Sequence, residues 1–148
     1  MRPHRASVAV SIRAHAKINL DLRVLGTRAD GFHELRSLVI GVGLADQVHC
    51  QTSLEPGVAL DCDDPALNHG DNLALLAARS LAKHCDREPA LRIDLQKHIP
   101  VGGGLGGGSS DAGAVLVGLN DLLGLSLSNR RLAAAATELG ADVPFFVY

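Results

Sequence analysis

The sequence predicts an α+β domain that contains half-buried antiparallel strands and amphipathic helices. The first observation is that apolar and polar residues alternate with a period of two over residues 8–25, as in a half-buried antiparallel strand. The second is that later segments, such as residues 112–123, repeat apolar residues at helical spacing. With 148 residues the chain is long enough for one domain with a hydrophobic core and short for two. We therefore treat residues 1–148 as a single domain.

The N-terminal part of the chain predicts a hairpin followed by short strands. Residues 8–25 exceed the usual strand limit of about 10 residues, so we expect a bend, or two strands, near residues 14–16. The sequence GTRADG at residues 26–31 is typical of a turn, and residues 32–42 are expected to return as the second hairpin strand. Two more short strands are expected, at residues 46–54 and 57–62.

Helical and strand patterns follow one another in the rest of the chain. Asp71 or Asn72 can cap the first turn of a helix. Gly124 and Gly140 are typical of residues that end helices. The expected elements are, in order, a helix within residues 69–85, a strand at residues 90–100, a helix beginning at Ser110, a helix near residues 129–139, and a turn into a buried strand over the last eight residues.

Composition and charge argue against several classes of function. The formal net charge is −2 and Lys and Arg are scattered, which argues against nucleic-acid binding, including RNA binding by a small α+β domain of ribosomal type. No apolar run approaches the roughly 20 residues of a membrane span. The three cysteines are widely spaced and lack a C-x-x-C pattern, so we expect reduced, mostly buried thiols in a cytoplasmic protein.

A glycine-rich loop, PVGGGLGGGSSD at residues 100–111, is the most informative motif. It lies between an expected strand and the N-terminus of an expected helix, where several backbone N–H groups and the helix dipole can converge on an anion. Ser109 and Ser110 add hydroxyl donors, and Asp111 is expected in the first helical turn. The loop therefore predicts a phosphate-binding site.

Other interpretations of the loop are weaker. A Walker A motif needs a Lys directly before Ser109, and none is present. Gly102, Gly104 and Gly107 formally satisfy the dinucleotide pattern G-x-G-x-x-G, but among so many glycines the match is nearly automatic. The preceding strand alternates, whereas a Rossmann strand is buried on both faces. A flexible hinge without a ligand is the remaining alternative, and the two serines and the following helix disfavour it.

Three segments together extend this prediction: AKINLDLRVLGTRADGFHEL (residues 16–35), PVGGGLGGGSSDA (100–112) and LGADVPFFV (139–147). They resemble the diphosphocytidyl-methylerythritol kinases of the galactokinase–homoserine kinase–mevalonate kinase–phosphomevalonate kinase (GHMP) superfamily. The resemblance implies the superfamily's ribosomal-protein-like N-terminal domain, an α+β fold with a mixed, largely antiparallel sheet and helices on one face. The family's C-terminal domain, of similar size, is missing from these residues, so we expect a chain truncated after the catalytic aspartate.

The resemblance implies that ATP phosphorylates the 2-hydroxyl of 4-diphosphocytidyl-2-C-methyl-D-erythritol, in the non-mevalonate route to isoprenoid precursors. Lys17 and Asp142 fall on the catalytic pair. Mg²⁺ is expected to bridge the phosphates; the sequence does not identify its protein ligands, and Ser109 or Ser110 is the best candidate. Phe32 and His33 fall on the segment that stacks on and hydrogen-bonds the cytidine base. Asn19, two residues along the polar face from Lys17, is placed to bond Asp142 or the substrate. The ATP side is assigned to Asn72 and Lys97, near the adenosine, and to the phosphate loop of Pro100, Val101, Gly102, Gly103, Gly104, Leu105, Gly106, Gly107, Gly108, Ser109 and Ser110.

The chain departs from the family pattern at two positions, and simpler interpretations exist for the catalytic pair. His15 stands where the family usually has Pro, and Gly113 replaces a common Ala, which can cost up to ~1 kcal/mol of helix stability. Without the resemblance, Lys17 would be a solvated strand lysine and Asp142 a turn residue.

Several functions therefore stay open. The chain is a small-molecule kinase, or a nucleotide-binding module without catalysis, or a kinase for another small alcohol such as mevalonate or homoserine. Its partners are expected to be small molecules rather than nucleic acid or membrane. Self-association is expected through the apolar face that a missing domain would cover.

Overall fold

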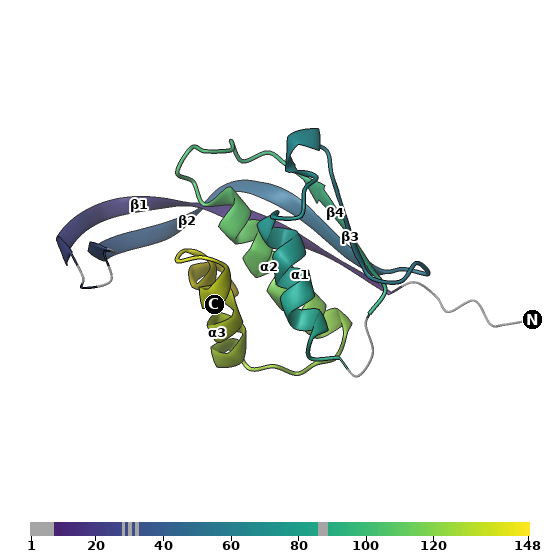
Figure 1. The fold of residues 1–148 in the computed structure, drawn as a ribbon. Helices are drawn as coiled ribbons and strands as arrows, with labels where there is room; N and C mark the ends of the chain where they lie inside the picture. Colours follow the sequence, from purple (N-terminus) through teal and green to yellow (C-terminus); the bar gives the residue numbers. More distant parts are fainter. Residues whose placement is uncertain (1–7, 28, 30, 32, 86–88) are drawn as a thin grey trace, which may run out of the picture.

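A computed structural model describes residues 8–27, 29, 31, 33–85 and 89–148. It contains a four-stranded sheet in the order β1-β2-β4-β3 (Figure 1). All neighbours are antiparallel except β3 and β4, which are parallel, so the predicted mixed, largely antiparallel sheet is confirmed. The strands are β1 (Ala9–Thr27), β2 (His33–Thr52), β3 (Val58–Cys62) and β4 (Leu91–Gln96).

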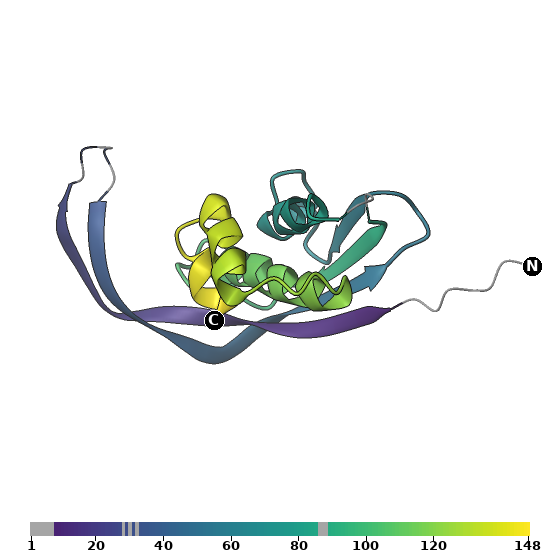
Figure 2. The same ribbon diagram turned by 90° about the horizontal axis from the view of Figure 1, so that it is seen from below.

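The helices cover one face of this sheet, as the sequence predicts (Figure 2). Their apolar stripes meet the sheet in one core, whose largest fully buried side chains include Leu81, Leu91, Ile93, Leu116 and Leu119. The helices are α1 (Leu73–Ala82), α2 (Gly107–Leu122) and α3 (Asn129–Leu139), with short 3-10 helices η1 (Pro65–Leu67) and η2 (Val143–Val147). No helix in the described ranges is long and apolar enough to cross a membrane.

The first two strands form one long hairpin that projects beyond the helices (Figures 1 and 2). The prediction of two separate strands for residues 32–42 and 46–54 is wrong, because β2 runs unbroken for 20 residues. The pairing of β2 with β1 shifts register opposite Ala16, and β2 continues through this irregularity as one strand. The predicted bend near residues 14–16 therefore falls at a register shift within one continuous β1.

The apolar side of the projecting hairpin is exposed, contrary to the half-buried pattern. Alternation predicts burial of one face along all of β1, but the helices reach only as far as its middle. The exposed apolar side chains of this arm are Leu20, Leu22, Val24, Leu25, Leu35, Leu38 and Ile40.

The C-terminal segment also differs from the prediction. The last residues form the 3-10 helix η2 rather than a strand, because Pro144 lacks an N–H for a sheet ladder and its fixed φ suits the first turn of a helix. Val143 and Val147 of η2 are buried in the core shared with α2 and α3. Helix α2 likewise begins at Gly107, three residues before the predicted Ser110, so the last glycines belong to the helix.

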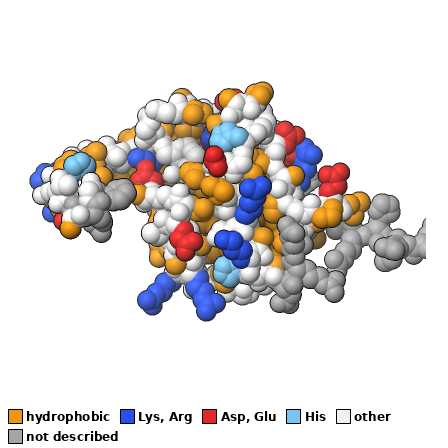
Figure 3. All heavy atoms as spheres, viewed as in Figure 1, with side chains coloured by type: hydrophobic (Ala, Val, Ile, Leu, Met, Phe, Trp, Pro, Cys, Tyr) orange, Lys and Arg blue, Asp and Glu red, His pale blue; other side chains and the backbone are white. Residues whose placement is uncertain are grey.

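The structure shows how charge is distributed on one face and how the cysteines are buried. On the face shown in Figure 3, side chains of both signs are present, and several Lys and Arg side chains lie near one another toward the lower edge. Cys50 and Cys62 are buried in the core, and burial raises the pKa of the Cys50 thiol to about 12. Cys85 is only half-buried, so the prediction of a buried thiol is less accurate there.

Candidate active site

The glycine loop requires glycine at alternate positions. It joins the end of β4 to the start of α2, and Gly102, Gly104 and Gly106 have φ angles of 77°, 72° and 71°. Side chains other than glycine rarely adopt this left-handed region. Gly106 is also the N-cap of α2, so the turn brings free N–H groups of the first helical residues to the loop. This is the local arrangement that binds anions at helix N-termini.

The glycine loop lies in direct contact with Lys17. The N–H of Lys17 donates to the carbonyl of Leu105 at 2.9 Å, which ties β1 to the loop. A Cβ added to Gly106 would lie 3.0 Å from Cγ and 3.1 Å from Cε of Lys17. The absence of a side chain at Gly106 therefore leaves the space that the lysine stem occupies.

Lys17 and Asp142 meet although they come from opposite ends of the chain. Lys17 Nζ lies 3.3 Å from Asp142 Oδ2 and donates to Asn19 Oδ1 at 3.4 Å. The side chain of Lys17 is only 8% exposed, whereas that of Asp142, just before η2, is 54% exposed. The pair therefore has a buried ammonium and a carboxylate that a ligand can reach.

The register shift explains how a lysine assigned to the polar face becomes buried. Ala16 and Lys17 are consecutive, yet both are buried, which strict alternation does not allow. The ladder is irregular between His15 and Lys17, where Val42 and two further residues of β2 lie opposite Ala16. Irregularities of this kind re-aim side chains. His15, at the position where the family usually has Pro, points its Nδ1 to the Val42 carbonyl at 2.9 Å.

A cavity of about 240 Å³ lies between the glycine loop and the start of α1. Pro100 and the loop residues as far as Gly108 form one wall, and Asn72, Leu73 and Lys97 are on the other sides. Asn72 also caps α1: its Oδ1 accepts from the N–H of Ala74 at 2.9 Å. Ser109 and Ser110, predicted as hydroxyl donors to the phosphates, are not among the residues that line the cavity, and Ser110 is 2% exposed within α2.

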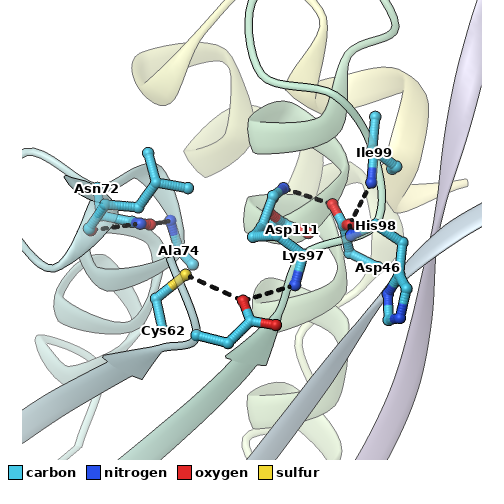
Figure 4. Close-up of polar contacts among 10 residues, drawn as sticks. Asp46, Cys62, Asn72, Ala74, Lys97, His98, Ile99 and Asp111 are labelled. Carbon is cyan, nitrogen blue, oxygen red and sulfur yellow. Dashed lines mark hydrogen bonds and ion pairs between the residues drawn. The ribbon is translucent and has the colours of Figure 1, made fainter. Parts of the chain in front are cut away.

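Lys97 is held between two buried carboxylates (Figure 4). Its Nζ pairs with Asp46 Oδ2, and with Asp111 Oδ2 at 2.6 Å. Burial would raise the pKa of Asp46, but the bonds from Lys97, His98 and Ile99 outweigh burial and lower it. Burial raises the pKa of Asp111 to about 7 despite Lys97, and the Lys97 pKa is raised because its two acidic partners outweigh burial.

Sequence reasoning missed this cluster. Asp111 was expected in the first turn of the helix, but it is the fifth residue of α2 and points inward. Asp46 belongs to no motif, and its only signal is an acidic residue at the start of an expected strand. Contacts across 51 positions, as between Asp46 and Lys97, leave no trace in a local pattern.

His33, the described residue of the predicted cytidine segment, lies apart from this cluster. His33 begins β2 at the tip of the hairpin, where its Nδ1 lies 3.3 Å from Oγ1 of Thr27 (Figure 1). Phe32 lies outside the described residues. The structure thus groups the predicted loop with Lys17, Asn19 and Asp142, and leaves His33 at the far end of the arm.

Comparison with known proteins identifies the family to which the chain belongs. The family profile described as GHMP kinases N terminal domain matches residues 72–148, and the chain belongs to this kinase family. Within that class it is similar to 4-diphosphocytidyl-2-C-methyl-D-erythritol kinases. One from Prochlorococcus marinus (strain MIT 9303) is 49% identical over 138 residues, 92% of this chain and 43% of the relative. Another, from Citrifermentans bemidjiense, is 46% identical over 140 residues, 94% of this chain and 50% of the relative.

A solved structure gives the same result. The crystal structure of 4-(cytidine 5'-diphospho)-2C-methyl-D-erythritol kinase superposes with a TM-score of 0.79 at 39% identity. The match covers 93% of this chain and 48% of that chain. This chain spans about half the length of the relatives it matches.

Proposed function

We propose that this chain carries the nucleotide-binding and catalytic half of an ATP-dependent kinase that phosphorylates the 2-hydroxyl of 4-diphosphocytidyl-2-C-methyl-D-erythritol. The observation that carries the proposal is the Lys17–Asp142 pair, at 3.3 Å, beside the Gly106 end of the glycine loop. The substrate is inferred from the substrate of the related kinases.

The cavity and the loop suggest how ATP would lie. The adenosine would occupy the space beside Asn72 and Lys97, and the phosphates would follow the loop toward Gly106. Free N–H groups at the start of α2 would bind the phosphate oxygens. The outermost phosphate would then lie next to Lys17, whose stem touches Gly106.

Phosphoryl transfer depends mainly on positioning and on stabilising charge. The buried Lys17 ammonium, which pairs with the Asp142 carboxylate, would attract the negative charge on the transferred group. The half-exposed Asp142 carboxylate would accept the proton of the substrate hydroxyl or orient that hydroxyl. Asn19, which accepts from Lys17, would hold the ammonium in place.

A magnesium ion fits this site only as a partner of the nucleotide. Among the described residues, no group of three or more His, Cys, Asp or Glu side chains could hold a metal. Magnesium bound through nucleotide phosphates needs only one or two protein ligands, and Asp142 is the accessible carboxylate near the expected phosphates. When bound, the ion would neutralise charge on the phosphates.

The experiment compares Asp142→Asn with the wild-type chain, with ADP release and ATP affinity measured separately. We expect turnover of the cytidyl substrate to fall at least about 100-fold. ATP affinity, measured without Mg²⁺, should stay within about threefold, because Asp142 does not line the cavity. Asp61→Asn on β3, which removes an exposed ion pair with Arg92 of β4, is the matched control. Equal losses of turnover and ATP affinity would show that Asp142 is structural.

A nucleotide-binding module without catalysis is the second candidate. The exposed apolar side chains of the hairpin arm favour it, because they suggest a surface that a further domain or a second copy would cover. Saturable ATP binding without ADP formation in the presence of the cytidyl compound, mevalonate or homoserine would support this candidate.

We further propose that the chain self-associates through the hairpin arm, which sedimentation would test. We also propose a cytoplasmic location, supported by the unbridged thiols of Cys50 and Cys62.

A further inference from the structure

The Asp46 carboxylate accepts hydrogen bonds from the segment that leads into the glycine loop. The ladder between β2 and β4 ends at Gln96. Beyond it, Asp46 Oδ1 accepts from the N–H of His98 at 2.5 Å and of Ile99 at 2.8 Å, while Oδ2 pairs with Lys97. The carboxylate therefore replaces backbone partners where the ladder stops (Figure 4).

The same cluster reaches the other end of the loop. Lys97 pairs with Asp111 in the second turn of α2. A Cβ added to Gly107, the first residue of α2, would lie 3.3 Å from Lys97 Nζ and 3.0 Å from Cγ2 of Ile99. Asp46 thus connects β2 to both ends of the loop, directly at one end and through Lys97 at the other.

The loop needs such anchors because its glycines give it large conformational freedom in the absence of contacts. We infer that Asp46 is a positioning residue, which acts through Lys97 and Asp111 to hold both ends of the glycine loop where its N–H groups converge on phosphate. Asp46 is fully buried and is not among the cavity-lining residues, so it acts without touching the ligand. The link to phosphate rests on the function proposed above, whereas the link to loop position does not.

Two backbone amides report the position of the loop without contacting Asp46. The N–H of Lys17 donates to Leu105 in the middle of the loop at 2.9 Å. The N–H of Ser110 donates to Gly106 at 2.8 Å and closes the first turn of α2. If Asp46 positions the whole loop, its loss should expose both amides to exchange with solvent.

The test is residue-resolved hydrogen exchange by NMR on Asp46→Ala, in the absence of nucleotide. We expect exchange at Lys17 and Ser110 to accelerate at least about tenfold, which corresponds to about 1.4 kcal/mol, with amides of α3 within about twofold of wild type. Asp61→Ala, a surface change on β3, should alter neither reporter. Acceleration confined to His98 and Ile99, or equal throughout the chain, would overturn the inference, since the first means a local contact and the second general destabilisation.

Asp111→Asn provides a milder variant if Asp46→Ala does not fold. It weakens only the connection to α2 and leaves the bonds from His98 and Ile99 to Asp46 intact. Ser110 exchange should rise while exchange at His98 and Ile99 stays within about twofold. Unchanged Ser110 exchange in this variant would equally overturn the inference.

ATP affinity separates this inference from the proposed function. Wild-type chain that binds no ATP would refute the proposed nucleotide site, and the exchange results would still decide whether Asp46 positions the loop. Where wild type binds, Asp46→Ala should bind about tenfold more weakly. Unchanged ATP affinity alongside accelerated loop exchange would refute the claim that Asp46 prepares the loop for phosphate.

Discussion

Replacing Gly106 by alanine tests the contact between the loop and the candidate catalytic lysine. Two costs add at this position. The φ angle of 71° is unfavourable for alanine by about 1–2 kcal/mol. The new Cβ would also lie 3.0 Å from Lys17 Cγ, 3.1 Å from Lys17 Cε and 3.2 Å from Phe146 Cζ, and crowding of this kind costs about 1–3 kcal/mol.

Gly104→Ala isolates the first cost. Gly104 has nearly the same φ, 72°, but an added Cβ there would meet nothing within 4 Å. We therefore expect Gly104→Ala to lower the free energy of unfolding by about 1–2 kcal/mol and Gly106→Ala by about 2–5 kcal/mol. The difference between the two variants measures the crowding against Lys17 and Phe146.

The assay is guanidinium unfolding at 25 °C, followed by circular dichroism. With an m-value of about 4 kcal/mol/M, a difference of 2 kcal/mol separates the two midpoints by about 0.5 M. Equal midpoints for Gly104→Ala and Gly106→Ala would refute the reasoning, because they would show that Lys17 does not need the space above Gly106.

Three further predictions concern stability. Gly113→Ala should destabilise the chain by about 1–3 kcal/mol in the same assay, although alanine favours helices, because the new Cβ would lie 2.6 Å from Phe146 Cβ. Gly108→Ala, whose Cβ would be 3.8 Å from Leu73, is the control. Stabilisation by Gly113→Ala would contradict the close packing against Phe146. Asn72→Ala should lower the free energy of unfolding by about 1 kcal/mol, because α1 loses its N-cap hydrogen bond. Ser128→Ala should change it very little, because Ser128 caps α3 without a side-chain hydrogen bond. Equal losses in the two variants would show that the Asn72 cap does not stabilise α1. Burial raises the Asp111 pKa to about 7 from 3.8, so between these pH values the folded chain binds more protons than the unfolded chain. The stability that the protonated Asp111 contributes is therefore fully present below about pH 4 and is lost as the pH rises through 7. At about 1.4 kcal/mol per pKa unit, the free energy of unfolding changes by at most about 4 kcal/mol. The free energies of unfolding of wild type and Asp111→Asn, measured across this pH range, should therefore converge or cross as the pH rises. A pH-independent difference would show that Asp111 does not titrate in this range.

The functional part of the fold was largely predictable because its signals are local. Period-two alternation predicted β1, β3 and β4, and helical spacing predicted α1, α2 and α3. The glycine run between a strand and a helix predicted the loop, and its left-handed φ angles at Gly102, Gly104 and Gly106 follow from the same composition. The proximity of Lys17 and Asp142 was predicted only through the resemblance to a family, since nothing local connects positions so far apart.

Patterns within about ten residues thus determined the strands, the helices and the presence of a bare-backbone loop. Only the tertiary structure decided that a register shift buries Lys17, that the C-terminal segment is the helix η2, and that Asp46, Lys97 and Asp111 join at the base of the loop. The physical reason is that each of these depends on which distant segments pack together. Burial and pairing across the sheet, rather than the order of neighbouring residues, set the direction and the charge state of these side chains.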